Sequence, residues 1–566
     1  MPTEAEVADA AWGAPEPPPR VWSSGRWSLE LRGDELADIR CDGVLLARSL
    51  RFAARDRDWS TVPLADVASS GGLRVEARYL GLGARWDVVL EVVAGADRLD
   101  VRLDAVGREA WDRARVGLVL LHPPTVAGLP LRVTHPDGTA TETAFPGPIA
   151  PHQPATEIAA LAYAVHGLDL TVEFDGEVFE MEDHRNWTDA SFKTYGTPLG
   201  LPHPVAVQAG ERVVQRISLV VAGTALPPEP PAPTPIRLVP TGRPFPAIGL
   251  AASTEPGEGP DVPAAFHLVE VDVDAPGWRR ALDRALDAAE AAGAAADVRL
   301  FSREPDALAA PVAALAGRRV VRLGATATRT QVTEPGHAAA LAAAAADLDV
   351  ELVVGARSHF TEVNRRLAEL PTTGSLAFAS TPGAHDGERA QLVESIAMQR
   401  LVVEQAARIG RPLHVGPVTL RPRYLTFAAR PLPAPEPGIG YLIAPDATDP
   451  RQRSAAAAAW SVASAAALAV DGVASISYFE TWGPRGIVTA AGERYPVAAA
   501  IDALAALAGA ERLAVDGVLP ADVWVAAARR GADDTVLIAN LAPRELVVPF
   551  RDGRSATLPP LSWTRL

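Results

Sequence analysis

Apolar and polar residues alternate with a period of two from about Val21 to Val221. The phrases RWSLELRG, LRVEARYL, WDVVLEVV and RVVQRISLVV show this alternation, and Gly, Asp and Pro separate them. Such a pattern is typical of strands that bury one face, and the periodicity of long helices is nearly absent. It predicts an N-terminal β-sandwich domain over residues 1–225.

The opening of this segment, RWSLELRGDELADIRCDGVLLARSL, resembles the supersandwich of galactose mutarotases in its fold. The stretch that follows, residues 226–246, is rich in proline. Proline lacks an amide donor and fixes φ, so it favours an extended spacer over a strand or a helix. We therefore expect a linker between two domains here.

Beyond the linker, eight short apolar segments alternate with Ala-rich helical stretches: IGLAAS, HLVEVDV, DVRLFSR, VVRLGAT, ELVVGAR, SLAFAST, PLHVGPV and SISYFET. This alternation predicts a parallel (β/α)8 barrel of the TIM type over residues 247–508. The closing segments VWVAAARR, TVLIANL, ELVVPF and SWTRL predict a small antiparallel β domain over residues 509–566. The expected fold class is thus a multidomain β plus α/β protein.

The composition of the chain limits the partners and the cellular location that we expect. The 566 residues carry a formal charge of −16 without a basic cluster, which argues against a nucleic-acid partner. The single cysteine, Cys41, excludes an internal disulfide and, with no secretory signal pattern at the start, favours a reducing, cytoplasmic location.

The Ala-rich stretch Ser454–Val470 is too short and too weakly hydrophobic to span a bilayer, so we expect a buried helix and no membrane partner. The oligomeric state stays open, with a homo-oligomer as one option.

The chain contains one lysine, Lys193, and it lies in the densest polar and aromatic run, FEMEDHRNWTDASFKTY. Lysine is a compact point charge with a tunable pKa, which an arginine cannot replace. Lys193 could also merely neutralise Glu182 or Asp183. The run predicts a flap that lines a carbohydrate-sized pocket at the barrel boundary, or else a self-satisfied network of turns. Its substrate-binding candidates are Glu182, Asp183, His184, Arg185, Asn186, Trp187 and Lys193.

Active sites of (β/α)8 barrels lie at the carboxyl ends of the strands. Two carboxylates there, Glu362 after the fifth strand and Glu480 at the eighth, could face each other as general base and general acid. Each could equally form a salt bridge, for example with Arg365 or Arg485. Further polar and aromatic candidates at these strand ends are His359, Asn364, His385, Asp386, Glu388, Arg421, Arg423, Tyr424, Tyr478 and Trp482.

Tyr478 and Trp482 could stack on a sugar ring or simply pack in the core. The histidines His359, His385 and His414 raise the question of a metal, but the first strand lacks a His-x-His pair and His414 starts its strand. We therefore expect no metal and no other cofactor. Serine-hydrolase, zincin, P-loop and dinucleotide motifs are absent from the sequence.

Taken together, FEMEDHRNWTDASFKTY, SHFTEVNR, TPGAHDGE, DPRQRSAAAAAW and YFETWGPRG resemble the D-apionate lactonases. These bacterial enzymes of D-apiose breakdown hydrolyse D-apionolactone to D-apionate. The resemblance runs through all three segments in the same order. It implies a β-rich N-terminal domain, a central barrel, a β-rich C-terminal domain and a small sugar lactone as the substrate.

The resemblance also implies attack of water on a five-membered lactone carbonyl, which needs a base, groups that stabilise an oxyanion, and an acid for the leaving alkoxide. We predict Glu362 as the base and His385 or Glu480 as the acid. The candidates for the oxyanion are Lys193, Arg423 and Asn364, and those for the sugar hydroxyls and ring are Asp386 and Trp482.

Two other functions stay open. One is a glycoside hydrolase that uses Glu362 and Glu480 as its carboxylate pair, although glycosidase barrels usually place these groups after the fourth and seventh strands. The other is a non-catalytic carbohydrate-binding protein built on the sandwich.

Overall fold

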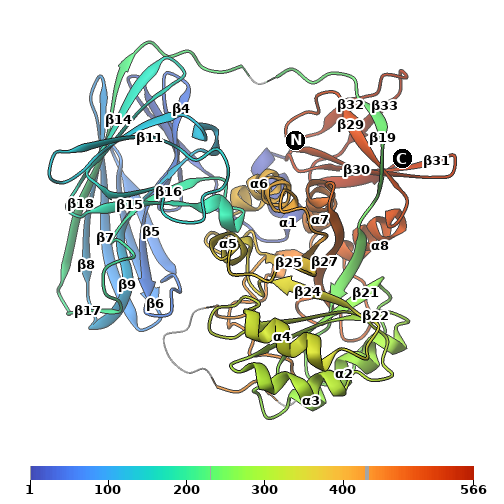
Figure 1. Ribbon diagram of the computed structural model, residues 1–566. Helices are drawn as coiled ribbons and strands as arrows, with labels where there is room; N and C mark the ends of the chain where they lie inside the picture. The colour runs from blue at the N-terminus through green and yellow to red at the C-terminus, as the bar shows by residue number, and fades with distance from the viewer. Residues whose placement is uncertain (1, 230, 427–432, 437) are drawn as a thin grey trace.

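The computed structural model describes residues 2–229, 231–426, 433–436 and 438–566. Figure 1 shows three bodies: a β-sandwich on the left, a barrel at the lower right and a smaller sheet at the upper right. This arrangement confirms the predicted fold class.

The sandwich consists of two nine-stranded antiparallel sheets that enclose one apolar core. Strict alternation of buried and exposed residues on its strands explains why the period-two pattern was visible in the sequence. In pairing order, the first sheet contains β1 (Arg20–Ser24), β2 (Trp27–Arg32), β3 (Glu35–Cys41), β4 (Val44–Asp56), β9 (Trp111–His122), β16 (Phe192–Gly196), β15 (Phe179–Asp183) and β12 (Ala155–Ile158), with β17 (Val205–Val207) beside β9. The second contains β11 (Ala140–Ala144), β10 (Pro130–Thr134), β13 (Ala160–Val165), β14 (Leu168–Asp175), β18 (Arg212–Gly223), β8 (Arg98–Gly107), β7 (Ala84–Ala94), β6 (Arg74–Gly81) and β5 (Leu64–Ser70).

The barrel contains the eight predicted strands, which pair in parallel and in sequence order until β20 closes the sheet against β27. They are buried on both faces, which is why each one appears in the sequence as an apolar run. The strands are β20 (Ala247–Ala251), β21 (Phe266–Asp272), β22 (Ala295–Ser302), β23 (Val320–Ala327), β24 (Glu351–Gly355), β25 (Ser375–Ser380), β26 (Leu413–Val418) and β27 (Val473–Trp482), and β28 (Gly486–Val488) pairs with β27.

The barrel strands alternate with seven described helices. The predicted Ala-rich helix is α7, and its residues are buried from Ala456 to Leu468 because it packs between α6, α8 and the C-terminal sheet. The helices are α2 (Trp278–Ala291), α3 (Ala309–Ala313), α4 (Pro335–Ala344), α5 (Phe360–Arg365), α6 (Arg389–Ala407), α7 (Ala455–Leu468) and α8 (Pro496–Leu507), and the short 3-10 turns are η1 (Pro124–Val126), η2 (His184–Trp187), η3 (Pro305–Leu308) and η4 (Pro450–Arg453). In the part of the chain that the structure describes, no helix has both the length and the apolar character needed to cross a membrane.

The C-terminal sheet differs from the prediction at its edge. The second half of the proline-rich stretch is not a free spacer but forms β19 (Arg237–Pro244), which pairs with β29 (Glu511–Asp516). An edge strand tolerates proline because one row of its amides needs no partner. The remaining strands are β30 (Val523–Arg530), β31 (Asp533–Asn540) and β34 (Ser562–Arg565), with a separate hairpin of β32 (Leu546–Pro549) and β33 (Ser555–Leu558).

The first residues also depart from the expected sandwich. They form α1 (Glu4–Trp12), which Thr3 and Glu6 cap at its N-terminus through a reciprocal capping box. Trp12 is buried in the barrel core, and Asp9 pairs with Arg389 at the start of α6. This helix therefore fastens the N-terminus to the barrel rather than to the sandwich.

Candidate active site at the boundary of sandwich and barrel

One face of the first sandwich sheet carries charged side chains. On β4, Arg51 and Arg55 alternate with the buried residues Leu50, Phe52 and Ala54, so the two arginines lie on the side opposite the sandwich core. The same face continues across β9, β16 and β15, because directly opposed residues of antiparallel strands point to one side. Its members, which we call the charged face, are Arg51, Arg55, Arg115, Glu180, Glu182, Lys193 and Tyr195.

The charged face meets the barrel through two ion pairs. Arg51 Nη1 lies 3.2 Å from Asp386 Oδ2, and Arg365 Nη2 lies 3.2 Å from Glu182 Oε1. Asp386 follows β25, and Arg365 ends the helix that follows β24, so the carboxyl ends of the fifth and sixth barrel strands face the sandwich. Figure 1 shows α5 at this boundary, between the two bodies.

The polar run Phe179–Tyr195 folds into the hairpin β15–η2–β16, and part of its polarity is structural. Asp183 accepts hydrogen bonds from Arg185 Nε at 2.8 Å and Arg185 Nη2 at 2.7 Å. Asn186 donates to the carbonyl of Ala150 at 2.6 Å and accepts from Asn364 Nδ2 at 3.0 Å. For these residues the structure agrees with a self-satisfied network, which anchors the hairpin against α5.

A second part of the run faces the barrel and forms a carboxylate–imidazole pair. Asp189 Oδ2 lies 2.9 Å from His385 Nδ1, and Gln391 Nε2 donates to Asp189 Oδ1 at 3.1 Å. A carboxylate is only an acceptor, so this bond favours the tautomer with the proton on Nδ1 and a lone pair on Nε2. Within the described part of the chain no residue hydrogen-bonds Nε2, and the His385 side chain is 18% exposed. We call Asp189 and His385 the dyad.

Two aromatic side chains hold the His385 ring in place. The His184 ring stacks on it with centroids 4.5 Å apart and planes 7° apart, and the Trp187 ring meets it edge-on at 5.2 Å. Burial lowers the pKa of His184 well below its usual value, with a further contribution from Lys193. His184 is therefore neutral and can lie against a positively charged His385 without repulsion.

Lys193 sits beside the dyad and across the sheet from Glu182. Its Nζ lies 3.2 Å from Glu182 Oε2 and 4.5 Å above the Tyr195 ring. Burial lowers the pKa of Lys193, although Glu182 opposes the shift. Burial also raises the pKa of Glu182, but Lys193, Arg365 and His385 outweigh it and lower the pKa overall. The ion pair considered from the sequence is thus present, and it lies on the face that meets the barrel.

The two predicted catalytic glutamates have different surroundings. Glu362 lies in the first turn of α5, where it accepts hydrogen bonds from Ser358 Oγ and from the backbone N–H of His359. Glu480 ends β27 and accepts from the N–H of Thr254 at 3.1 Å and from Arg485 Nε at 2.9 Å. Burial raises the pKa of both carboxyls. Glu362 therefore helps to start a helix, and Glu480 forms a salt bridge with Arg485, one of the two roles expected for it.

Most of the other barrel candidates also have structural contacts. Arg423 is held by Glu270, with contacts of 2.6 Å and 2.7 Å. Tyr478 is fully buried and donates to Ser464 Oγ at 3.0 Å, and Trp482 is buried in the barrel core, so both agree with packing rather than ring stacking. Asp386 lies at the boundary, where it pairs with Arg51.

Two groups of described residues bring metal-ligand types together: His184, Asp189 and His385, and Glu35, Asp386 and Glu388. In the first group the two imidazoles are nearly parallel, and because each lone pair lies in its ring plane, the rings cannot both point at one ion. In the second, Arg48 lies 3.6 Å from Glu35 and Arg51 lies 3.2 Å from Asp386. Burial raises the pKa of Glu388, which favours a proton there. Neither donor set fits a metal well.

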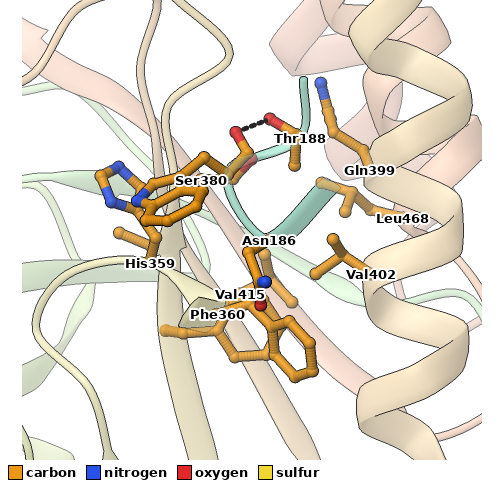
Figure 2. Close-up of a pocket in the computed structure, with 12 residues that line it drawn as sticks. Asn186, Thr188, His359, Phe360, Ser380, Gln399, Val402, Val415 and Leu468 are labelled. Atoms are coloured by element: carbon orange, nitrogen blue, oxygen red, sulfur yellow. Dashed lines mark hydrogen bonds between the residues drawn. The ribbon is translucent and has the colours of Figure 1, made fainter. Parts of the chain in front are cut away.

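A small cavity lies beneath the hairpin, between η2, β25 and the helices α6 and α7. Figure 2 labels Asn186, Thr188, His359, Ser380 and Gln399 among the residues that line it. Ser380 Oγ and Gln399 Nε2 are buried without a hydrogen-bond partner in the structure. With a volume of about 10 Å³, the cavity suits an ordered water molecule and not a sugar.

Three residues of this boundary were not singled out from the sequence. Asp189 lies inside the polar run, but its partner is 196 positions away. Arg55 and Arg115 belong to sandwich strands, where an alternating arginine looks like an ordinary solvent-facing position. The signal that was available was the phrase ARSLRFAARDRDW, in which alternation puts three arginines on one face.

Comparison with known proteins adds evidence of relationship. One family model, described as the N-terminal domain of D-apionate lactonase, matches residues 7–224, and a second, its TIM barrel domain, matches residues 251–509. A curated relative, D-apionate lactonase of Brucella anthropi, is 29% identical over 545 residues, which cover 87% of this chain and 88% of the relative.

Solved structures resemble parts of the chain only distantly. A putative aldose 1-epimerase of Escherichia coli K12 covers 37% of this chain and 99% of its own, with 13% identity and a TM-score of 0.27. A GH30 endoxylanase of Clostridium papyrosolvens covers 59% of this chain and 99% of its own, with 11% identity and a TM-score of 0.39.

Proposed function

Because the chain belongs to the D-apionate lactonase family, we propose that it is a lactonase that hydrolyses D-apionolactone to D-apionate in D-apiose breakdown. Such an enzyme is a carboxylic-ester hydrolase, and its substrate is a small uncharged molecule. The free, buried Cys41 supports the further proposal of a reducing, cytoplasmic location.

The observation that carries the proposed mechanism is the dyad. A neutral imidazole whose Nδ1–H is fixed by a buried carboxylate presents a basic Nε2, which is the arrangement that activates water or a hydroxyl in many hydrolases. The His385 side chain is partly exposed at the boundary, near the ammonium group of Lys193 and the carboxylate of Glu182. A lactone carbonyl that enters this boundary would meet a base and a cation together.

In the proposed reaction, His385 Nε2 takes a proton from water while the water oxygen attacks the lactone carbonyl carbon. The carbonyl electron pair moves onto oxygen, and Lys193 stabilises the resulting oxyanion. When the tetrahedral intermediate collapses, the ring C–O bond breaks and the imidazolium returns its proton to the departing alkoxide. The new carboxylic acid then ionises and releases a proton to solvent.

In this mechanism His385 carries out both proton transfers. It therefore takes the role of general base that the sequence predicted for Glu362. Glu362 and Glu480 are held by a helix start and by Arg485, respectively. A glycosidase needs two carboxyl groups that flank one bond and are free to act on it. The contacts of these two residues therefore support a lactonase over a glycoside hydrolase.

The poor fit of both candidate ligand groups supports a metal-independent reaction. We expect the activity to persist after treatment with EDTA and removal of the chelated ions. Loss of activity that added Zn²⁺ or Mn²⁺ restores would contradict this expectation.

Proton release near neutral pH on a panel of aldonolactones that includes D-apionolactone tests the function. We expect enzyme-dependent acid formation that is selective for the branched lactone. His385→Asn should lower kcat by about a hundredfold to ten-thousandfold, the usual contribution of general acid–base catalysis. Asp189→Asn should lower it by about a hundredfold, because the ring loses its tautomer and its orientation.

His166→Asn serves as the matched control, because His166 is exposed on the β13–β14 turn and has a positive φ that asparagine tolerates. Acid formation at the uncatalysed rate in every sample would refute the lactonase proposal. Full activity of His385→Asn with loss of activity in Glu362→Gln would restore the base predicted from the sequence.

A further inference from the structure

Two arginines of the charged face have no carboxylate partner among the described residues. Arg55 on β4 and Arg115 on β9 oppose each other directly across the two antiparallel strands, so their side chains leave the sheet on the same side. Among the described residues, neither guanidinium has a carboxylate within 4.0 Å. By contrast, their neighbours Arg51 and Arg57 pair with Asp386 and Asp112.

The hydrogen bonds of the two arginines leave donors unused. Arg55 Nη1 donates to the carbonyl of Trp59 at 3.0 Å, and Arg115 Nη1 donates to the carbonyl of Ala114 at 2.6 Å. Arg115 is only 6% exposed, yet its Nε and Nη2 have no hydrogen-bond partner in the part of the chain that the structure describes. Its guanidinium lies 5.1 Å from the centre of the Trp59 ring, which fixes the side chain without satisfying these donors.

This arrangement destabilises the folded protein unless an anion is bound. Like charges opposite each other in a sheet repel, and a buried donor without an acceptor loses its hydration without compensation. Burial lowers the pKa of both arginines, with a further contribution from Arg51 at Arg55 and from Arg113 at Arg115. Glu180 and Glu182 act on Arg115 only from beyond ion-pair distance.

The pair is continuous with the proposed reaction site. Arg55 contributes to the lowered pKa of both Lys193 and His184, so it lies on the side of the dyad. Arg115 lies opposite Arg55 on β9, the strand that pairs with β16. A lactone is uncharged, but its ring-opened product carries a carboxylate, and planar guanidinium groups match the two oxygens of a carboxylate.

We infer that Arg55 and Arg115 form a subsite for the carboxylate of a small polyhydroxy acid, the ring-opened product. The identity of this acid rests on the proposed lactonase function. The subsite favours product over substrate, so D-apionate is expected to inhibit the enzyme.

Calorimetric binding of sodium D-apionate tests the subsite without any turnover. Sodium acetate tests the carboxylate alone, and erythritol tests an uncharged polyol. We expect the wild type to bind D-apionate, acetate to bind weakly, and erythritol not to bind. Arg115→Met and Arg55→Met should each weaken D-apionate binding by about tenfold or more, which corresponds to the loss of a charge-assisted hydrogen bond.

Thermal unfolding separates this role from a structural one. Without ligand, Arg115→Met should unfold at a higher temperature than the wild type, because an unpaired buried charge is replaced by an apolar side chain of similar length. The rise in Tm that D-apionate gives the wild type should be lost. Arg102→Met, at an exposed position on the other sheet, is the matched control and should leave both quantities unchanged.

Equal D-apionate binding by the wild type and both variants would overturn the subsite, and so would a lower Tm of ligand-free Arg115→Met. If Arg115→Met fails to fold, that too counts as a structural role for Arg115, and the binding affinity of Arg55→Met then shows whether Arg55 alone contacts the carboxylate. A wild type that binds D-apionate through these arginines but opens no lactone would refute the proposed function and leave the subsite intact.

Discussion

The mouth of the barrel and the boundary with the sandwich both contain buried charges and ion pairs. Among the described residues, however, the boundary also contains Arg55 and Arg115, which lie in no ion pair. At the mouth, Glu270 pairs with Arg423 at 2.6 Å and with Arg357 at 3.3 Å, and Arg485 pairs with Glu480 at 2.9 Å. The Arg357 guanidinium is also packed against the Phe301 and Tyr424 rings. At the boundary, the Nε2 of His385 and the Nε and Nη2 of Arg115 have no partner in the described structure. At the mouth, Arg357 Nη2 also lacks a hydrogen-bond partner there, but its guanidinium is paired with Glu270.

This difference is the reason why we propose the boundary, and not the mouth, as the place of the chemistry. An ion-paired cluster of arginine, carboxylate and aromatic groups fills space and fixes the barrel, whereas charged groups without an ion-pair partner are available to a ligand. In the proposed site the barrel contributes His385, and the sandwich contributes Asp189 and Lys193. We therefore expect neither domain to be active alone.

The largest expected effect tests the structural role of the mouth. In Glu270→Gln, two buried guanidinium groups lose their shared counter-charge, which should lower the free energy of unfolding by about 3–5 kcal/mol. Urea denaturation followed by circular dichroism measures this loss, with exposed Glu109→Gln as the control. The kcat of the folded variant, measured at low temperature, should stay close to that of the wild type. A stable variant with a greatly reduced kcat would indicate that the reaction takes place at the mouth and not at the boundary.

Lys193→Met tests the boundary. Removing the cation that we assign to the oxyanion should lower kcat by about a hundredfold to a thousandfold, or roughly 2.7–4 kcal/mol in activation free energy. Lys193→Arg should recover only part of this loss, because a guanidinium cannot place its charge at the same point. Steady-state rates on D-apionolactone measure both variants. If Lys193→Met keeps the wild-type kcat, Lys193 only neutralises Glu182 and does not stabilise the oxyanion.

The sequence predicted the fold more fully than the site, for physical reasons. The eight barrel strands are buried on both faces, so local composition alone marks them. The edge strand β19 was not predicted, because its prolines disfavour a strand when only the local sequence is considered. Pairing with β29, which the local sequence does not show, stabilises it. His385 was predicted because it follows a barrel strand, but Asp189 was not, since their hydrogen bond joins two domains.

The smallest expected effect is a loss of folding stability at acidic pH. His184 is buried at the boundary and its pKa is lowered, so the unfolded chain binds a proton more readily than the folded protein does. Stability should therefore be fully present above the ordinary histidine pKa near 6.5 and should fall as pH decreases below it, by about 1.4 kcal/mol for each pH unit. Burial also lowers the pKa of other histidines, namely His122, His267, His359 and His414. Only the part of the loss that His184→Asn removes therefore belongs to the boundary. Comparison of Tm between pH 7 and pH 5 in the wild type and in His184→Asn measures it, and a pH dependence that is identical in the two proteins would contradict the assignment.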